Sequence, residues 1–160
     1  MSMEGCPGSR MIDMRKEKGQ TDQTGKPTAS VASQLRQWPV QMHLISPAAP
    51  YYGGADVLLS ADCVAYTVGG FHSDYLQGKS LGIACPKLDE GQDVYVEKVK
   101  SWIDDAKINT LTVMIMQVPC CSGLLQMAVQ AAKEAERQVP IKAMVVDLQG
   151  EIIQEDWVEI

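Results

Sequence analysis

The stretch TVMIMQVPCCSGLLQMAVQAAKEAE, residues 112–136, carries the pattern that decides the fold. It begins with an apolar run that is typical of a buried strand, and it continues with apolar residues at helical spacing. A Pro-Cys-Cys-Ser-Gly turn joins the two parts, so the chain changes from strand to helix at Cys120 and Cys121. A strand followed by an amphipathic helix is the building unit of a parallel α/β sheet.

Four further apolar runs accompany this unit, and turn-forming residues bound most of them. Between the third and fourth of the five runs, Tyr95, Val99 and Trp102 lie on one face of a predicted helix. We therefore predict an α/β fold: a three-layer, Rossmann-like sandwich with a mainly parallel sheet of about five strands. The predicted strands are residues 40–45, 55–63, 80–86, 110–121 and 141–153, the last turning at Gln149-Gly150 into a short final pairing.

The beginning of the chain differs from the rest. RKEKGQTDQTGKPTASVASQ, residues 15–34, is polar and has neither hydrophobic period. We predict a flexible polar arm over residues 1–33 and one α/β, cysteine-rich, cluster- or metal-binding domain over residues 34–160. No apolar run approaches the roughly 20 residues of a membrane helix, and the first residues lack the apolar core of a signal peptide. We therefore expect a cytoplasmic protein.

The charge of the chain limits its partners. The formal net charge of the 160 residues is −6, which argues against binding to the phosphate backbone of nucleic acid. No glycine-rich phosphate loop joins a predicted strand to a helix, so we assign no nucleotide site. Neither a nucleic acid nor a membrane is expected as a partner.

The five cysteines carry the functional signal. Thiols stay reduced in the cytoplasm, and any single cysteine could be a small buried apolar residue. Four of them, however, end predicted strands, and ligands bind where the carboxyl ends of parallel strands meet. Thiolates gathered at one edge suit a structural zinc ion or an iron–sulfur cluster. The predicted ligands are Cys63, Cys85, Cys120 and Cys121, with Cys6 outside the main site.

Three stretches resemble a known family. They are LRQWPVQMHLISPAAPYYGGADVLLSADCVAY (residues 35–66), FHSDYLQGKSLGIACPKLD (residues 71–89) and VPCCSGL (residues 118–124). From about Leu35 to Ile153, the chain is similar to the C-terminal domain of ferredoxin-type 4Fe-4S iron–sulfur binding proteins of bacteria and archaea. Longer members of that family carry a ferredoxin module with two C-x-x-C-x-x-C-x-x-x-C-P motifs, and these 160 residues contain neither motif.

The resemblance implies a cluster context rather than a reaction. Together with the placement of the cysteines, it leads to our main hypothesis, a module that binds one 4Fe-4S cluster at the sheet edge. Such a module would serve electron transfer or the assembly of redox proteins. The expected partner is a redox protein such as a ferredoxin.

Two other functions stay open at this point. In the first, the protein is a thiol-dependent enzyme with Cys120 or Cys121 as nucleophile. The free N–H groups at the start of the following helix would favour its thiolate form. In the second, zinc replaces the cluster and stabilises an interaction domain without catalysis.

Other side chains near the cysteines are weaker candidates. His43, at the end of the first predicted strand, could be a fifth ligand or a donor to a thiolate, but we favour a hydrogen-bonded strand-end role. His72 and Asp74 could act in acid–base chemistry, although a surface hydrogen bond is the favoured role. Charge or oxygen ligands could also come from Asp62, Lys87, Asp89 and Glu90, for which solvation is the commoner state.

Overall fold

A computed structural model describes residues 30–160, so most of the predicted arm lies outside the described residues. The centre of the fold is a five-stranded sheet in the order β2-β1-β3-β4-β5. β1 pairs in parallel with β2 and β3, β3 pairs in parallel with β4, and β5 is antiparallel to β4. The predicted α/β fold with a mainly parallel sheet is confirmed. The strands are β1 (Asp56–Ala61), β2 (Ser80–Ala84), β3 (Thr110–Met116), β4 (Ile141–Val146) and β5 (Ile152–Val158).

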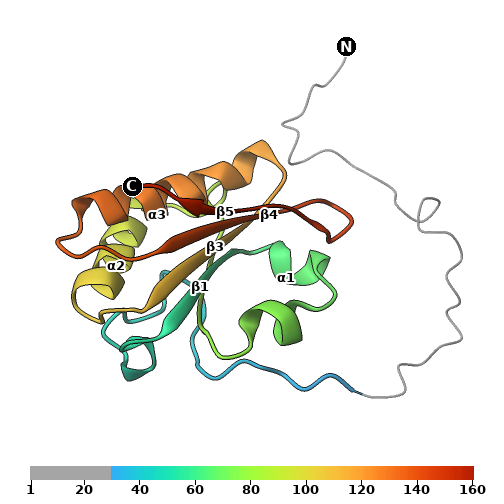
Figure 1. Ribbon diagram of the computed structural model, residues 1–160, viewed down its shortest axis with the longest axis horizontal. Coiled ribbons are helices and arrows are strands. Elements are labelled where there is room, and N and C mark those ends of the chain that lie inside the picture. Colours follow the sequence, from blue (N-terminus) through green and yellow to red (C-terminus); the bar gives the residue numbers. More distant parts are fainter. Residues whose placement is uncertain (1–29) are drawn as a thin grey trace, which may run out of the picture.

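Helices lie on both faces of this sheet (Figure 1). α2 (Asp93–Asp104) and α3 (Ser122–Glu134) pack against each other on one face. α1 (Val64–Thr67) and a π-helical segment (Phe71–Leu76) cover the other face. This division follows from right-handed crossovers, because the chain moves outward from β1 to β2 and then back past β1 to β3. The crossover from β2 to β3 runs in the opposite direction to the crossover from β1 to β2. α2 therefore lies on the opposite face of the sheet from α1.

Residues 40–45, predicted to form a strand, make only one bridge to the sheet. Gln41 pairs with Ile83 of β2, and the chain then turns, with the amide of Ile45 donating to the carbonyl of Gln41 at 3.0 Å. Met42 and Ile45 are buried, whereas the two residues between them are exposed. Burial three residues apart is the pattern of a helical turn, not of a strand. The strand prediction was wrong here.

The segment before this turn covers the outer edge of β2. The side-chain amide of Gln37 accepts from the Leu81 N–H at 2.8 Å and donates to the Leu81 carbonyl at 2.7 Å. The hydroxyl of Tyr52 donates to the same carbonyl at 2.8 Å. Burial raises the pKa of Tyr52 well above its ordinary value, so the hydroxyl keeps its proton. These bonds occupy backbone groups that an edge strand otherwise leaves unpaired.

Side chains pack most tightly on β2 at Gly82. Trp102 of α2 is the largest fully buried side chain, and Met42 is also fully buried. A Cβ atom added to Gly82 would lie 2.8 Å from both Met42 Sδ and Trp102 Cη2. Only glycine lets the indole ring rest directly on the strand, so this position fixes how closely α2 approaches the sheet.

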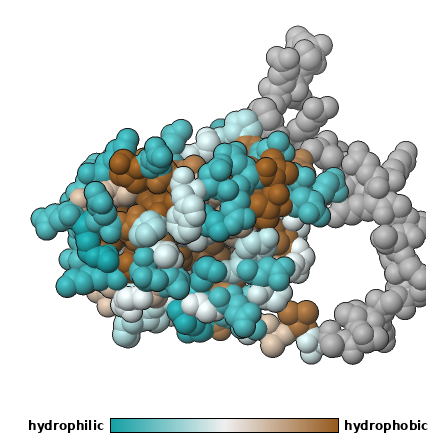
Figure 2. Space-filling view, in the orientation of Figure 1, coloured by the Kyte–Doolittle hydropathy of each residue, from teal (hydrophilic) through white to brown (hydrophobic). Residues whose placement is uncertain are grey.

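Figure 2 shows a largely hydrophilic face on which a few apolar patches are visible. β5 forms the second edge of the sheet, and most of its side chains are exposed, including Ile153 and Trp157. Within residues 30–160, no helix is both long enough and apolar enough to cross a membrane.

The Gly82→Ala substitution tests the packing of α2 on β2. We expect the free energy of unfolding to fall by about 1–3 kcal/mol, because a methyl group overpacks the contact with the rigid indole ring. Chemical denaturation measures the change. Gly69→Ala is the matched control, since a Cβ atom there meets nothing within 4 Å. Equal stabilities of the two variants would contradict the packing described here.

Candidate metal centre

The order of the strands brings three loops to one edge of the sheet. β1 lies between β2 and β3, with Ala61 paired to Ala84 of β2 and Ser60 paired to Met114 of β3. Neighbouring strands lie about 4.8 Å apart. The loops that follow these three strands therefore begin side by side at the carboxyl edge.

Each of these loops carries one or two cysteines. Cys63 follows β1 at the second position, and Cys85 directly follows β2. A 3-10 turn, Pro119–Cys121, carries the adjacent pair between β3 and α3. Each strand therefore ends before its cysteine rather than on it, but all four are at the predicted edge. We call Cys63, Cys85, Cys120 and Cys121 the cysteine rim; all are free thiols, and they range from exposed Cys63 to buried Cys121.

A direct contact ties the β2 loop to the start of α3. A Cβ atom added to Gly123 would lie 3.3 Å from the Cβ atom of Pro86. Pro86 follows Cys85, and Gly123 is two residues beyond Cys121. The close approach therefore packs the segments that carry these two cysteines against each other.

Two thiols of the cysteine rim, those of Cys63 and Cys121, have raised pKa values. Burial is the main cause that raises the pKa of Cys63, followed by nearby negative charges that include Cys85 and Cys120. Burial also raises the pKa of Cys121 to about 11, partly offset by a backbone hydrogen bond and reinforced by Cys120 and Cys63. Since the repulsion between like charges weakens with distance, these shifts indicate that the thiols lie near one another.

The pKa of Cys121 differs from the expectation drawn from the sequence. The free N–H groups at the start of α3 were expected to favour a thiolate, which would lower the pKa. The Cys121 side chain is only 6% exposed, and the cost of burying its charge outweighs the effect of the helix. Without a bound cation, Cys121 is therefore a protonated thiol at neutral pH.

A set of hydrogen bonds holds the loop after β2 in place. The Asp89 N–H donates to the Cys85 carbonyl at 2.9 Å, and the Cys85 N–H donates to Asp89 Oδ2 at 3.0 Å. The Tyr95 hydroxyl donates to the same carboxylate oxygen at 2.5 Å. The side-chain amide of Gln92 donates to the carbonyls of Asp89 and Pro86. We call this network the Asp89 clasp.

Sequence reasoning noted Asp89 only as a weak oxygen ligand and missed the clasp. A signal was present, because a carboxylate four residues after Cys85, in a turn started by proline, can cap backbone groups of that turn. The contribution of Tyr95 had no such signal. Its place on the apolar face of the helix was predicted, but the contact of its hydroxyl with Asp89 is known only once the helix is docked on the sheet.

The two histidines take part in hydrogen bonds away from the thiols. Nε2 of His43 lies 2.6 Å from the Glu90 carbonyl, and the imidazole ring packs against Tyr95 with ring centroids 4.5 Å apart. Nδ1 of His72 accepts from the Gln34 N–H at 3.0 Å. Both histidines form hydrogen bonds, as favoured, but His43 lies in a turn and not at the end of a strand.

Asp62 connects β1 to Cys63. Its N–H donates to the Ala84 carbonyl at 3.1 Å. Its Oδ1 atom is buried and has no hydrogen-bond partner among residues 30–160. Burial is the main cause that raises the pKa of this carboxyl, and the charge of Asp89 adds to it. A proton or a nearby positive charge would stabilise a carboxyl group in this position.

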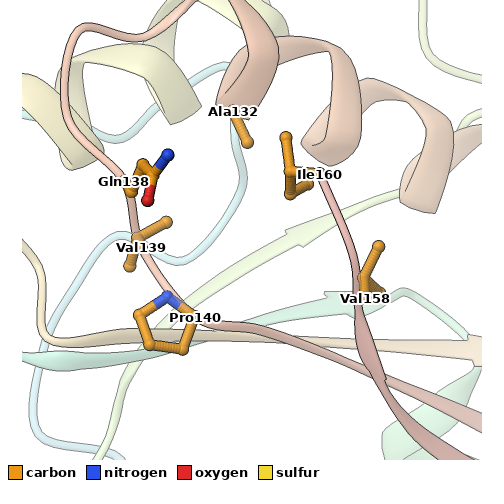
Figure 3. A pocket seen from close by; sticks show the side chains of 6 residues that line it. All are labelled: Ala132, Gln138, Val139, Pro140, Val158 and Ile160. Atoms are coloured by element: carbon orange, nitrogen blue, oxygen red, sulfur yellow. The ribbon is translucent and has the colours of Figure 1, made fainter.

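A separate hollow lies at the amino end of β4 (Figure 3). Its volume is about 330 Å³. It is lined by Ala132, Gln138, Val139, Pro140, Val158 and Ile160, none of which is ionisable. Across the described part of the chain, no group of three or more His, Cys, Asp and Glu side chains is arranged to hold a metal ion. The cysteine rim nevertheless gathers more reactive side chains than this hollow.

Comparisons with known proteins agree with the fold. A family model described as a Rossmann-like domain matches residues 49–160. The chain belongs to this Rossmann-like domain family. An uncharacterized protein of Archaeoglobus fulgidus is 31% identical over 121 residues, which cover 74% of this chain and 83% of that relative. No solved structure matches the chain. Neither description mentions an iron–sulfur cluster, so these matches support the Rossmann-like fold and not the ferredoxin-type resemblance.

The pKa of Cys121 predicts how the metal-free Rossmann-like domain responds to alkali. The folded-state pKa of about 11 lies above the ordinary value of 9.0, so between these values the folded chain holds a proton that the unfolded chain has lost. The stabilisation is complete below pH 9.0 and is lost as the pH rises through about 11. We expect the free energy of unfolding to fall across this window, measured by urea denaturation under reducing conditions with chelator.

The Cys121→Ala variant is the control for this titration. Tyrosines titrate in both proteins alike, so the variant should lose less stability than the wild type over the same pH range. Parallel losses in the two proteins would show that Cys121 is not a buried thiol with a raised pKa.

The Asp89 clasp is tested by Asp89→Ala. The change leaves the Cys85 N–H and the Tyr95 hydroxyl without their carboxylate acceptor, and we expect a loss of about 1.5–3 kcal/mol in the free energy of unfolding. Alkylation of Cys85 by iodoacetamide should also become faster, because its loop is released. Glu90→Ala, which removes the neighbouring exposed carboxylate, should change stability by about 0.5 kcal/mol or less. A similar result for both variants would argue against the clasp.

Proposed function

We propose that the cysteine rim binds one [4Fe-4S] cluster and that the Rossmann-like domain serves electron transfer or the assembly of redox proteins. The observation that carries the proposal is the meeting of three loops, distant in sequence, that bring four free thiols to one edge of the sheet. Burial raises the pKa of Cys63 and Cys121, and the neighbouring thiols add smaller contributions. Four cysteine thiolates are the usual ligands of such a cluster. The resemblance of residues 35–66, 71–89 and 118–124 to ferredoxin-type proteins supports the same cofactor.

The chemistry of the donor set fits this cofactor. The cost of burial, together with repulsion between thiolates, keeps Cys63 and Cys121 protonated, and positively charged iron would offset both effects. Cys120 and Cys121 directly precede α3, whose free N–H groups and positive dipole end would favour thiolates there. The Asp89 clasp holds the backbone at Cys85, so that this ligand is positioned before binding.

The exposure of the rim fits a role in transfer between proteins. Cys121 is buried, whereas Cys63 is exposed, so the site would have one side in the protein and one side at the surface. A bound [4Fe-4S] cluster supplies one-electron chemistry. Contact with another protein at the exposed side would bring a second redox centre within reach.

The two alternatives have less support. A thiol-dependent enzyme requires a nucleophile with a lowered pKa, whereas the pKa of Cys121 is raised to about 11. A zinc-stabilised interaction domain would use the same four cysteines. Zinc–sulfur bonds of about 2.3 Å place the four sulfurs closer together than a cluster of four irons does. Metal analysis separates these two possibilities.

Serine substitutions at the rim test the proposal. We expect Cys63→Ser, Cys85→Ser, Cys120→Ser and Cys121→Ser each to lose most of the iron and acid-labile sulfide that the wild type binds during anaerobic reconstitution. The melting temperature of the reconstituted protein should fall in parallel, because binding to the folded state contributes to stability.

Cys63→Ser is the most informative member of this series. A thiol-dependent enzyme with its nucleophile in the Cys120-Cys121 pair has no need for Cys63. Cys6→Ser is the control and should keep its iron. Wild-type iron content and melting temperature in Cys63→Ser would refute a shared cluster.

A further inference from the structure

Two large apolar side chains stand exposed beside the cysteine rim. Tyr66 of α1, three residues after Cys63, is 93% exposed. Leu88, in the turn closed by the hydrogen bonds between Cys85 and Asp89, is 80% exposed. Single exposed apolar residues are common on protein surfaces. These two, however, lie in the neighbouring segments after β1 and β2, which also carry Cys63 and Cys85.

The same edge of the molecule is strongly acidic. The loops that follow β1, β2, β3 and β4 all emerge at this edge, and their one Lys or Arg is Lys87. The loop between β4 and β5 is held against the end of α1, because a Cβ atom added to Gly150 would collide with the Thr67 carbonyl. The carboxylates of these four loops are Asp62, Asp89, Glu90, Asp147 and Glu151.

We propose that these side chains form a docking surface for a protein whose contact face is apolar at its centre and rich in Lys and Arg around it. The surface consists of Tyr66 and Leu88 together with the five carboxylates, of which Glu90 and Glu151 are exposed and the other three are half-buried. This inference rests on the proposed function, because it assigns the partner of the cysteine rim. An acidic redox protein would be repelled from this edge.

The composition of the surface matches what transient redox contacts require. Tyrosine is among the residue types that carry most of the binding energy at protein interfaces. Complementary charges around such a centre mainly accelerate encounter and orient the partner. Short-lived electron-transfer contacts are small, below about 1,200 Å² in total, and a small apolar centre with a charged surround suits a contact of this kind.

A second exposed apolar region provides an internal control. Ile153 and Trp157 of β5 are also exposed, at 47% and 62%. The ammonium group of Lys142 lies 5.5 Å from the centre of the Trp157 ring and also pairs with Glu155. β5 is separated from the loops after β1 and β2 by β3 and β4. β5 therefore presents exposed apolar side chains at a place that carries no cysteine.

The experiment uses anaerobically reconstituted protein and cytochrome c, a small basic haem protein, as the cationic probe. Titration calorimetry at about 20 mM and about 200 mM salt measures the association, which should weaken at the higher salt because the charges are screened. We expect Tyr66→Ser and Leu88→Ser each to weaken binding about fivefold or more, with iron content unchanged. Trp157→Ser, at the far end of β5 from the loop after β4, should bind like the wild type.

Charge reversal supplies the second arm. Glu90→Lys should weaken association, whereas Glu134→Lys, the same change at the far end of α3, should not. Equal effects of Glu90→Lys and Glu134→Lys, or wild-type binding by both Tyr66→Ser and Leu88→Ser, would overturn the docking surface. Such a result with iron present leaves the cluster proposal intact. Binding that Tyr66→Ser and Leu88→Ser weaken, in a protein that holds no iron, supports the docking surface and rejects the cluster.

Discussion

The pairing of β1 with two parallel neighbours is the constraint on which the rest of the structure depends. Because β2 and β3 both align with β1 in the same direction, the three loops that follow them open at one edge. These loops come from positions spread between Cys63 and Cys121 in the sequence. Their meeting is therefore a property of the sheet, and a change that shifted the register of β1 would separate the four thiols.

This arrangement has two opposite energetic effects at the cysteine rim: it stabilises the packing of the loops, and it disfavours ionisation of the thiols. Packing of Pro86 against Gly123 and the Asp89 clasp hold the loops close together, which stabilises the fold. The same closeness and burial make it costly to ionise the thiols, as the raised pKa values of Cys63 and Cys121 show. A positively charged cofactor would relieve this cost without moving the loops far. The central claim is that the site is built for such a cofactor.

The sequence predicted the features that depend on local patterns. Apolar runs ending near cysteines located β1, β2 and β3, and helical spacing located α2 and α3, so the fold class and the shared edge could be predicted. Features that depend on how helices and turns pack onto the sheet could not be predicted. Residues 40–45 are apolar enough for a strand, but the burial of Met42 and Ile45, three residues apart, arises only when this turn packs on the sheet, with Met42 against Gly82. The pKa of Cys121 likewise depends on how deeply the turn before α3 is buried.

The central claim is tested most directly by metal and sulfide analysis of the full chain, purified and reconstituted without oxygen, together with its Mössbauer spectrum. The account predicts about four iron and four sulfide per chain, with the spectrum of a single cluster ligated by sulfur. Zinc bound in place of iron, or a chain that binds neither metal while its four thiols stay freely reactive, would contradict it.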